Sequence, residues 1–179
     1  MLRRVVALTC LLLSARPGPR VVADPADCRA ACERHIAYTL EASFDASERA
    51  SLEQAMGAWE RGTGGRVCFT PGGRDLVFEK VDRAEDLAPW DQQWSSHVAY
   101  TKGGHIRFVR SAVTDPGSFR ALGVHEIGHD LGLDHVDDVR FTYMHRSIDD
   151  VPPELREGAA LPEHDRRAYC ARHRCVCDR

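Results

Sequence analysis

Residues 125–135 of this chain read HEIGHDLGLDH, which places side chains that bind metals and transfer protons close together. A helix advances about 100° per residue, so His125 and His129 would lie one turn apart on the same face. Both imidazoles could then reach one small cation, such as zinc, at the roughly 2.0–2.1 Å of a zinc–nitrogen bond. Glu126 would lie beside this pair, where it is poorly placed as a third ligand but well placed as a general base acting on water.

Two further residues complete the pattern. Gly132 has no Cβ, so it can adopt the left-handed conformation that ends a helix and turns the chain. Such a turn would bring His135 back to the cation as a third ligand. Three neutral histidines leave the fourth position of a tetrahedral zinc ion for water, as catalytic rather than structural zinc sites do. The segment therefore predicts hydrolysis by a metal-activated water, with the three histidines as metal ligands and Glu126 as the general base.

The alternative interpretation is a helix face that is merely rich in solvated histidines. With the composition of this chain, the five fixed positions would match by chance in about one sequence in ten thousand. The same segment also has an apolar stripe, as expected of a helix that packs on a core, formed by Phe119, Leu122, Val124, Ile127 and Leu131. We therefore interpret the segment as a metal site.

The rest of the chain supplies elements that could position this site. Alternating apolar residues predict strands, and apolar residues at helical spacing predict helices. The expected strands are 33–44, 66–70 and 76–81, followed by a hairpin or two neighbouring strands at 97–101 and 105–109. The expected helices are 45–65, which has Asp45 or Ser47 as its N-cap, 118–131 and 163–173, whereas 136–161 is expected to be irregular. This order of elements predicts a single α+β domain over residues 24–179.

The N-terminal residues have the features of a secretory signal peptide. Two arginines precede a largely apolar run over residues 5–13, which is too short to span a membrane. Cleavage after Ala15 or after Ala23 fits the sequence, and we assign residues 1–23 to the signal peptide. The protein is therefore expected to be secreted, to the periplasm or to the cell exterior.

The cysteine count is consistent with export. Removal of the signal peptide would leave six of the seven cysteines: Cys28, Cys32, Cys68, Cys170, Cys175 and Cys177. An even number in a small exported domain predicts three disulfide bonds, whose pairing the sequence does not define. The alternatives are buried thiols or a thiolate metal site near the C-terminus, where the cysteine spacing matches no common zinc pattern.

Charge limits the classes of partner. Loss of residues 1–23 would remove four arginines and no acid, which changes the formal net charge from −3 to −7. A negative protein is not expected to bind nucleic acid or an anionic membrane. No later segment is long and apolar enough to span a membrane. The expected partner is a protein or peptide substrate, and the protein is expected to be a monomer.

The pattern HExxHxxGxxH in residues 125–135 resembles the metzincin zinc peptidases, most closely the short secreted matrixin-like forms of bacteria. That family has a methionine in a tight turn beneath the metal, and Met144 is the candidate here. The resemblance is strong over 120–146 and looser over the rest of 33–170. It implies a twisted mixed sheet with an active-site helix, a Met-turn and a C-terminal helix. It also implies a secreted zinc metalloendopeptidase with one catalytic Zn²⁺.

Other polar residues do not predict further metal ions. A structural zinc ion held by His97 and His105 is not expected, because the accompanying His-x-Asp pair of matrixins is missing. A calcium ion is not expected either, since it needs six or more converging oxygen atoms. Asp134 or Asp137 could hydrogen-bond to a zinc-ligating histidine and orient it.

We expect an extended peptide to bind along the edge strand near 97–101 or 105–109, and residues 145–161 to wall the side-chain pocket just beyond the scissile bond. Two other functions remain open. One is an exported zinc-containing binding module without catalysis, and the other is a zinc amidase that acts on a non-protein amide such as a cell-wall peptide link. The presence of Glu126 argues against the first, because a purely structural zinc site more often closes its fourth position.

Overall fold

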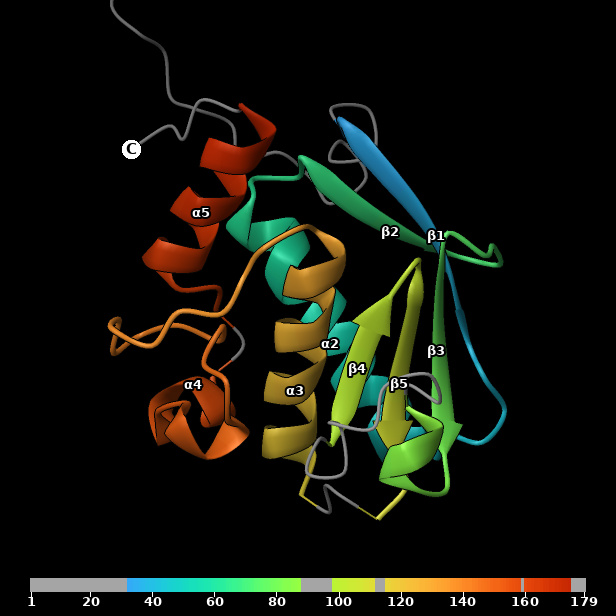
Figure 1. Ribbon diagram of the computed structural model, residues 1–179. Coiled ribbons are helices and arrows are strands. Elements are labelled where there is room, and N and C mark those ends of the chain that lie inside the picture. The colour runs from blue at the N-terminus through green and yellow to red at the C-terminus, as the bar shows by residue number, and fades with distance from the viewer. Residues whose placement is uncertain (1–31, 88–97, 112–114, 159, 175–179) are drawn as a thin grey trace, which may run out of the picture.

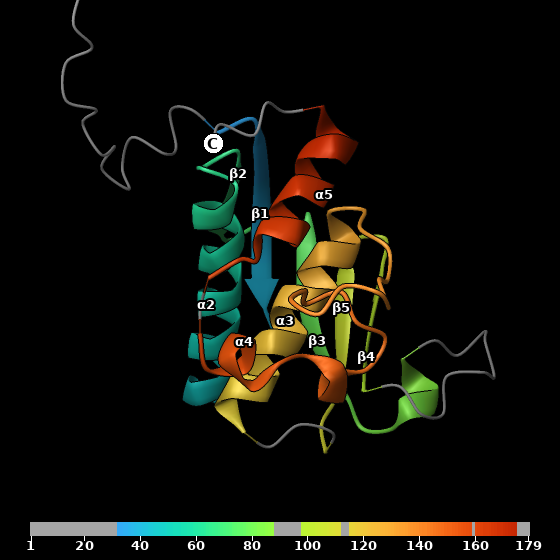
Figure 2. The ribbon, with the colours of Figure 1, turned by 90° about the vertical axis from the view of Figure 1, so that its left-hand side faces the viewer.

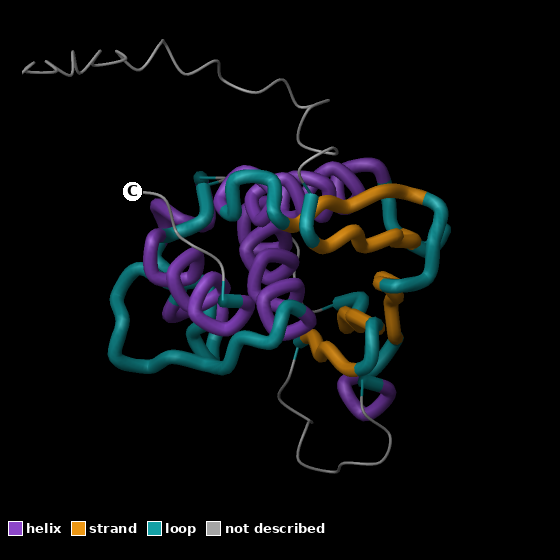
Figure 3. The backbone as a smooth tube through the Cα atoms, turned by 90° about the horizontal axis from the view of Figure 1, so that it is seen from above, coloured by secondary structure: helices purple, strands orange, loops and turns teal. Residues whose placement is uncertain are grey.

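The computed structural model describes residues 32–87, 98–111, 115–158 and 160–174, which form a twisted sheet packed against helices (Figure 1). The view from above shows strands gathered on one side and most of the helices on the other (Figure 3). The predicted signal peptide, His97 and three of the six predicted disulfide cysteines lie outside the described residues.

Within the described residues, the sheet has five strands in the order β2-β1-β3-β5-β4. They are β1 (Arg34–Leu40), β2 (Val67–Pro71), β3 (Leu76–Val81), β4 (Ala99–Lys102) and β5 (His105–Val109). All neighbouring strands are parallel except β4, which is antiparallel to β5. The predicted strands are therefore confirmed, and the last two form a hairpin. One edge of the sheet is the short strand β4, which runs against the other four.

Three longer helices complete the domain, and each was predicted. They are α2 (Ala46–Gly62), α3 (Pro116–Asp130) and α5 (Glu163–His173). Of the two N-cap candidates for α2, Asp45 is correct: its side chain accepts from the Glu48 N–H while the Glu48 side chain accepts from the Asp45 N–H. Figure 2 shows α2 and α3 side by side, with α5 above the end of α3.

One hydrophobic core joins the sheet to the helices. Trp59 of α2 is fully buried and donates its indole N–H to the carbonyl of Val124 in α3, at 2.9 Å. Phe119 of α3 packs on Phe108 of β5, with ring centroids 5.0 Å apart. Helix α3 is thus held from both sides, by α2 and by the sheet. It presents a fixed backbone for the side chains it carries.

The prediction that 136–161 is entirely irregular was wrong. This segment contains a 3-10 turn, η3 (Ile148–Asp150), and a short helix, α4 (Pro153–Glu157). Pro153 is the first residue of α4, where a missing N–H costs nothing and the fixed φ of proline favours a helix. A second 3-10 turn, η1 (Ala84–Asp86), follows β3. The prolines interpreted as breaks in the chain therefore mark a helix start.

Two other predictions are tested only partly. Within the described residues, no helix is long and apolar enough to cross a membrane. No disulfide joins any two of the three described cysteines, Cys32, Cys68 and Cys170. Because Cys28, Cys175 and Cys177 lie outside the described residues, the three disulfide bonds stay a prediction.

Candidate metal centre

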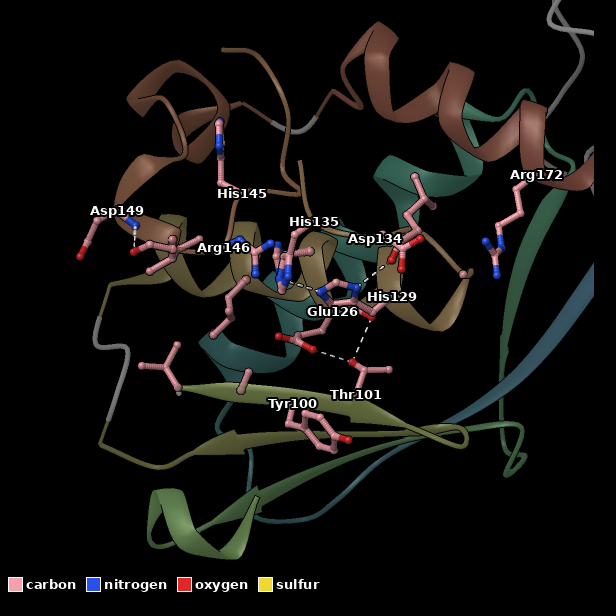
Figure 4. A pocket seen from close by; sticks show the side chains of 18 residues that line it. Tyr100, Thr101, Glu126, His129, Asp134, His135, His145, Arg146, Asp149 and Arg172 are labelled. Carbon is pink, nitrogen blue, oxygen red and sulfur yellow. Dashed lines mark hydrogen bonds between the residues drawn. The ribbon is translucent and has the colours of Figure 1, made fainter. Parts of the chain in front are cut away.

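The two histidines of the HEIGH segment lie in the last part of α3, on the side facing the sheet edge β4 (Figure 4). The helix begins at Asp115, whose side chain accepts from the Ser118 N–H, and its residues from Ala121 to Gly128 are all buried. His125 is 7% exposed, and His129, one turn later, is half-buried. The predicted helical spacing of these two side chains is confirmed.

The end of α3 turns the chain as expected from Gly132, which has φ of +90°. The N–H of Gly132 donates to the carbonyl of His129, and the N–H of Leu133 donates to the carbonyl of Gly128, both at 2.9 Å. These two bonds form a Schellman motif, the common way to end a helix at a glycine. The turn also places the Leu133 carbonyl 2.8 Å from Nδ1 of His129. It therefore both redirects the chain and orients a histidine.

The three histidines converge on one point. The Nε2 atoms of His125 and His129 lie 3.0 Å apart, those of His129 and His135 3.1 Å, and those of His135 and His125 3.3 Å. Nitrogen ligands of a tetrahedral zinc ion at roughly 2.0–2.1 Å lie about 3.3–3.4 Å from one another. In the described part of the chain, this is the one group of three or more metal-binding side chains whose ligand atoms lie this close together.

The hydrogen bonds of two histidines settle which nitrogen carries the proton. Nδ1 of His125 lies 2.6 Å from the carbonyl oxygen of Tyr143, and Nδ1 of His129 lies 2.8 Å from that of Leu133. A carbonyl only accepts, so Nδ1 donates in both rings and Nε2 keeps its lone pair. Burial lowers the pKa of His125 to about 3 and that of His129 below its usual range. Neutral rings with lone pairs aimed at one point are what a zinc ion requires, so these residues fit the metal.

The carbonyls of Tyr143 and Leu133 replace the carboxylates considered from the sequence. Asp137 forms an ion pair with Arg146 at 2.9 Å on the surface, and the acceptors of His125 and His129 are backbone carbonyls rather than this acid. The charge of Asp134 raises the pKa of His129. The acids of this loop are thus not the hydrogen-bond acceptors of His125 and His129.

Met144, the methionine expected from the family resemblance, is fully buried. Its carbonyl accepts from the N–H of Val136 at 2.8 Å, which ties the segment after His135 back to the methionine. A Cβ placed on Gly128 would lie 2.5 Å from Sδ of Met144 and 3.2 Å from the ring of Trp59. The glycine inside the HEIGH segment therefore allows the methionine and the tryptophan to reach the helix backbone.

The residues just before Met144 are held by the C-terminal helix. Asp165 of α5 is fully buried, and its carboxylate accepts from the hydroxyl of Thr142 and from the N–H of Tyr143, the latter at 2.8 Å. Burial raises the pKa of Asp165, and these two hydrogen bonds oppose the change. Since the Tyr143 carbonyl accepts from His125, a chain of contacts runs from α5 to a metal-binding ring. Sequence reasoning did not single out Asp165.

Glu126 is buried beside the histidines and faces the edge strand. Its Oε2 accepts from the hydroxyl of Thr101 on β4 at 2.6 Å (Figure 4). Burial raises the pKa of Glu126 to about 7 in the polypeptide, and the hydrogen bond from Thr101 opposes the change. A carboxylate whose pKa lies near neutrality can both take and return a proton at physiological pH. Thr101 was missed from the sequence, because it lies 25 residues from Glu126 in the chain.

These residues line a cleft of about 710 Å³ between α3 and β4. Its walls come from β4 on one side and from the segments after α3 on the other, including His145 to Asp149. His105, considered for a structural zinc, lies outside this cleft and pairs with Glu79, with 3.2 Å between Nδ1 and Oε1. All four predicted site residues, in contrast, line the cleft together: His125, Glu126, His129 and His135.

No protein-family profile matches the chain, and no curated protein matches it in sequence. Solved structures do match. High choriolytic enzyme 1, a hatching enzyme zinc-protease from Oryzias latipes (medaka fish), superposes with a TM-score of 0.51 at 14% identity, over 86% of this chain and 98% of that one. Archaemetzincin from Methanopyrus kandleri superposes with a TM-score of 0.55 at 12% identity, over 79% of this chain and 96% of that one. The fold expected from the sequence is confirmed.

Proposed function

We propose that this chain, which has a metzincin-like fold, is a zinc-dependent endopeptidase. The observation that carries the proposal is the geometry at the end of α3. Three Nε2 atoms converge within 3.3 Å of one another, next to a buried glutamate whose pKa is close to neutral. The group opens into a cleft, and in the part of the chain that the structure describes no fourth metal-binding side chain closes it, as catalytic zinc sites require.

A zinc ion held there would act as a Lewis acid, which makes water a nucleophile at neutral pH and polarises a scissile carbonyl. The residues of the chain perform the proton transfers. Glu126, when ionised, takes the proton of the attacking water, and then passes it to the leaving amine. Thr101 fixes the carboxylate by its hydrogen bond to Oε2 and favours the ionised form. Burial of Glu126 excludes bulk water from this exchange.

The sheet edge is the proposed binding place for the substrate backbone. Of the two candidate strands, β5 has neighbours on both sides, whereas among the described strands β4 pairs with β5 alone. The other side of β4 borders the cleft, which Val98, Ala99, Tyr100 and Thr101 line. An extended peptide can add to such an edge as a further strand, with backbone hydrogen bonds that do not depend on its sequence.

The segment after Met144 is the proposed wall of the side-chain pocket. Residues 145–149 line the cleft, and η3 and α4 follow directly. The hydroxyl of Tyr143 donates to the carbonyl of Leu155 at 2.8 Å, which ties α4 back to the residue beside the methionine. The residues before and after this wall are thus hydrogen-bonded to each other, which favours a pocket of fixed shape.

We further propose the cellular setting that the sequence predicts. The basic and apolar start of the chain supports a signal peptide and secretion, and the even number of remaining cysteines supports disulfide bonds. Within the metzincins, we place the chain with the short matrixin-like peptidases, which share the HExxHxxGxxH spacing and the later methionine. One zinc ion per chain and a monomer acting on a protein or peptide are the simplest forms of this proposal.

Replacement of Glu126 by glutamine tests the mechanism. Glutamine keeps the shape of the side chain but cannot accept a proton, so we expect peptide hydrolysis to fall by about 100-fold or more. Zinc content, measured by elemental analysis, should stay near one ion per chain. Glu157→Gln is the matched control, because Glu157 is exposed on α4 and does not line the cleft.

The wild-type assay separates this function from its rivals. The zinc-loaded protein should cut members of a proteome-derived peptide library, and a chelator should abolish the cuts. A protein that binds one zinc ion but cuts no peptide would contradict the proposal and would favour a binding module. Cleavage of cell-wall peptide links without cleavage of linear peptides would favour an amidase instead. Unchanged turnover in the Glu126→Gln variant would remove the proposed base.

A further inference from the structure

Two arginines line the cleft, one at each end. In Figure 4, Arg146 and Asp149 lie at one end, the histidines and Glu126 in the middle, and Arg172 at the other end. Arg172 belongs to the last turn of α5 and is exposed. A cation at one end of a substrate cleft is a potential contact for an anionic part of the substrate.

The turn after α3 makes room for Arg172. A Cβ placed on Gly132 would lie 2.4 Å from Nε of Arg172 and 3.2 Å from its Cζ. The missing side chain at position 132 thus has two consequences. It permits the φ of +90° that ends α3, and it lets the guanidinium lie over the chain at the rim of the cleft.

The two arginines differ in their partners. Arg146 forms an ion pair with Asp137 at 2.9 Å, which neutralises its charge locally. Among the described residues, Arg172 makes no ion pair and no hydrogen bond. Asp134, an acid that also lines the cleft, raises the pKa of His129 through its charge. With respect to the described residues, the guanidinium of Arg172 is thus available to bind a carboxylate in two-point geometry.

The direction of β4 tells which part of a peptide would meet Arg172. From Tyr100 to Thr101 the strand runs towards the Arg172 end of the cleft (Figure 4). A peptide that pairs with β4 in the antiparallel sense, which is slightly the more stable pairing, runs the opposite way. Its residues before the scissile bond then lie towards Arg172, and those after it lie towards residues 145–149.

We propose that Arg172 is a specificity-determining residue that favours substrates with Asp or Glu on the N-terminal side of the scissile bond. This inference rests on the proposed endopeptidase function and deepens it. The proposed substrates are peptides with an acidic residue at one position, where the carboxylate accepts a charge-assisted hydrogen bond from Arg172.

The test uses a peptide that the zinc-loaded wild-type protein cuts, in versions that carry Glu or Gln at each of the positions before the scissile bond. We expect Glu to be preferred over Gln at one of these positions by about three- to tenfold in kcat/KM, mainly through KM. Arg172→Gln should abolish this preference, and Arg172→Glu should reverse it in favour of a lysine-containing peptide. Higher salt should weaken the wild-type preference, because the contact is exposed.

Arg174→Gln is the matched control, since Arg174 ends the same helix, is exposed and does not line the cleft. It should keep the wild-type Glu preference. Three results would overturn the inference and leave the peptidase function intact. The Glu preference could be equal in wild type and Arg172→Gln, or it could fall as much in Arg174→Gln as in Arg172→Gln. It could also occur only at positions after the scissile bond.

A binding measurement separates the two proposals if no peptide is cut. Fluorescence anisotropy of matched Glu- and Gln-containing peptides with zinc-loaded Glu126→Gln protein reports recognition without catalysis. Tighter binding of the Glu peptide, lost on adding Arg172→Gln, supports the inference even where hydrolysis fails. Equal binding of both peptides overturns it.

Discussion

The metal centre has two halves, the last turns of α3 and the loop that follows, and they reach the same point by different means. In the helix half, the spacing of His125 and His129 follows from the backbone repeat, and the helix is buried between α2 and the sheet. In the loop half, His135 is the least buried of the three histidines. Its place depends on the turn at Gly132 and on the contact between Val136 and Met144.

The halves are less independent than this division suggests. The ring of His125, a helix residue, is oriented by the carbonyl of Tyr143, a loop residue, at 2.6 Å. The ring of His129 is oriented by Leu133 in the turn. Local structure therefore fixes where the helix ligands are attached, and the loop fixes how their rings face. We therefore expect that loss of a histidine lowers the free energy of unfolding by different amounts in the two halves.

The largest expected effect comes from removing a ligand from each half. His135→Ala and His125→Ala should each weaken zinc binding by more than about 100-fold and abolish activity, because one of three ligands is lost. The metal-free proteins should differ. His125→Ala leaves the Tyr143 carbonyl buried without its donor and opens a cavity, which should cost about 2 kcal/mol or more of unfolding free energy. His135→Ala should cost less than about 1 kcal/mol.

Zinc titration and urea unfolding of the metal-free variants measure the two quantities separately. Equal losses of stability in both variants would show that the loop is as tightly packed as the helix, against the comparison. Zinc content unchanged in His135→Ala would remove that residue from the ligand set.

A smaller effect is expected where the two halves pack on each other, at Gly128 and Met144. In an exposed helix, glycine to alanine stabilises by about 1 kcal/mol. Here the added Cβ would lie 2.5 Å from Sδ of Met144, so Gly128→Ala should instead destabilise by about 1–2 kcal/mol. Adding Met144→Ala makes room for the new methyl group, so the double variant should be more stable than the sum of the single effects by about 1 kcal/mol.

Gly57→Ala in α2 is the matched control for the helix effect. A Cβ there would lie 2.8 Å from the guanidinium end of Arg61, which can move aside, so this change should stabilise the protein. Unfolding free energies of the four proteins in the cycle give the coupling between helix and loop. Additive effects of the two substitutions would mean that Met144 does not support the helix at Gly128.

The same division explains what could be predicted from the sequence. The helix half follows from spacing alone: the placing of His125 and His129 on one helix face, with Glu126 beside them, and the turn at Gly132 were each predicted. The element order and the edge hairpin were also predictable, because apolar periodicity reports directly on strands and helices. The place of Met144 required a family resemblance, since a buried methionine has no local pattern of its own.

Contacts between distant segments could not be predicted. Thr101 and Asp165 lie 25 and 22 residues in the chain from the residues they hold, and no spacing rule joins them. The sequence suggested acids of the nearby loop as partners of the histidines, but for His125 and His129 the backbone carbonyls of Tyr143 and Leu133 have that role. Every residue has a backbone carbonyl, so the sequence does not show which carbonyl accepts a hydrogen bond from a histidine. The short helix α4 was missed because two prolines suggested a break rather than a helix start.

The smallest expected effect concerns Thr101, which links the sheet edge to the base on the helix. Thr101→Val keeps the shape of the side chain but removes the hydroxyl that donates to Oε2 of Glu126. This hydrogen bond lowers the pKa of Glu126, so its loss should raise that pKa. A hydrogen bond of about 1 kcal/mol corresponds to roughly half to one pKa unit.

The base must be ionised to act, so a higher pKa moves the acidic limb of the profile of kcat/KM against pH to higher pH. Below that limb, Thr101→Val should therefore be slower than wild type, and well above it the two rates should converge. Thr101→Ser keeps a hydroxyl and should restore the wild-type limb. A uniform loss of rate at every pH would instead indicate that Thr101 supports the edge strand for substrate binding. The sheet edge would then serve the substrate alone, and the pKa of the base would be set by burial within α3.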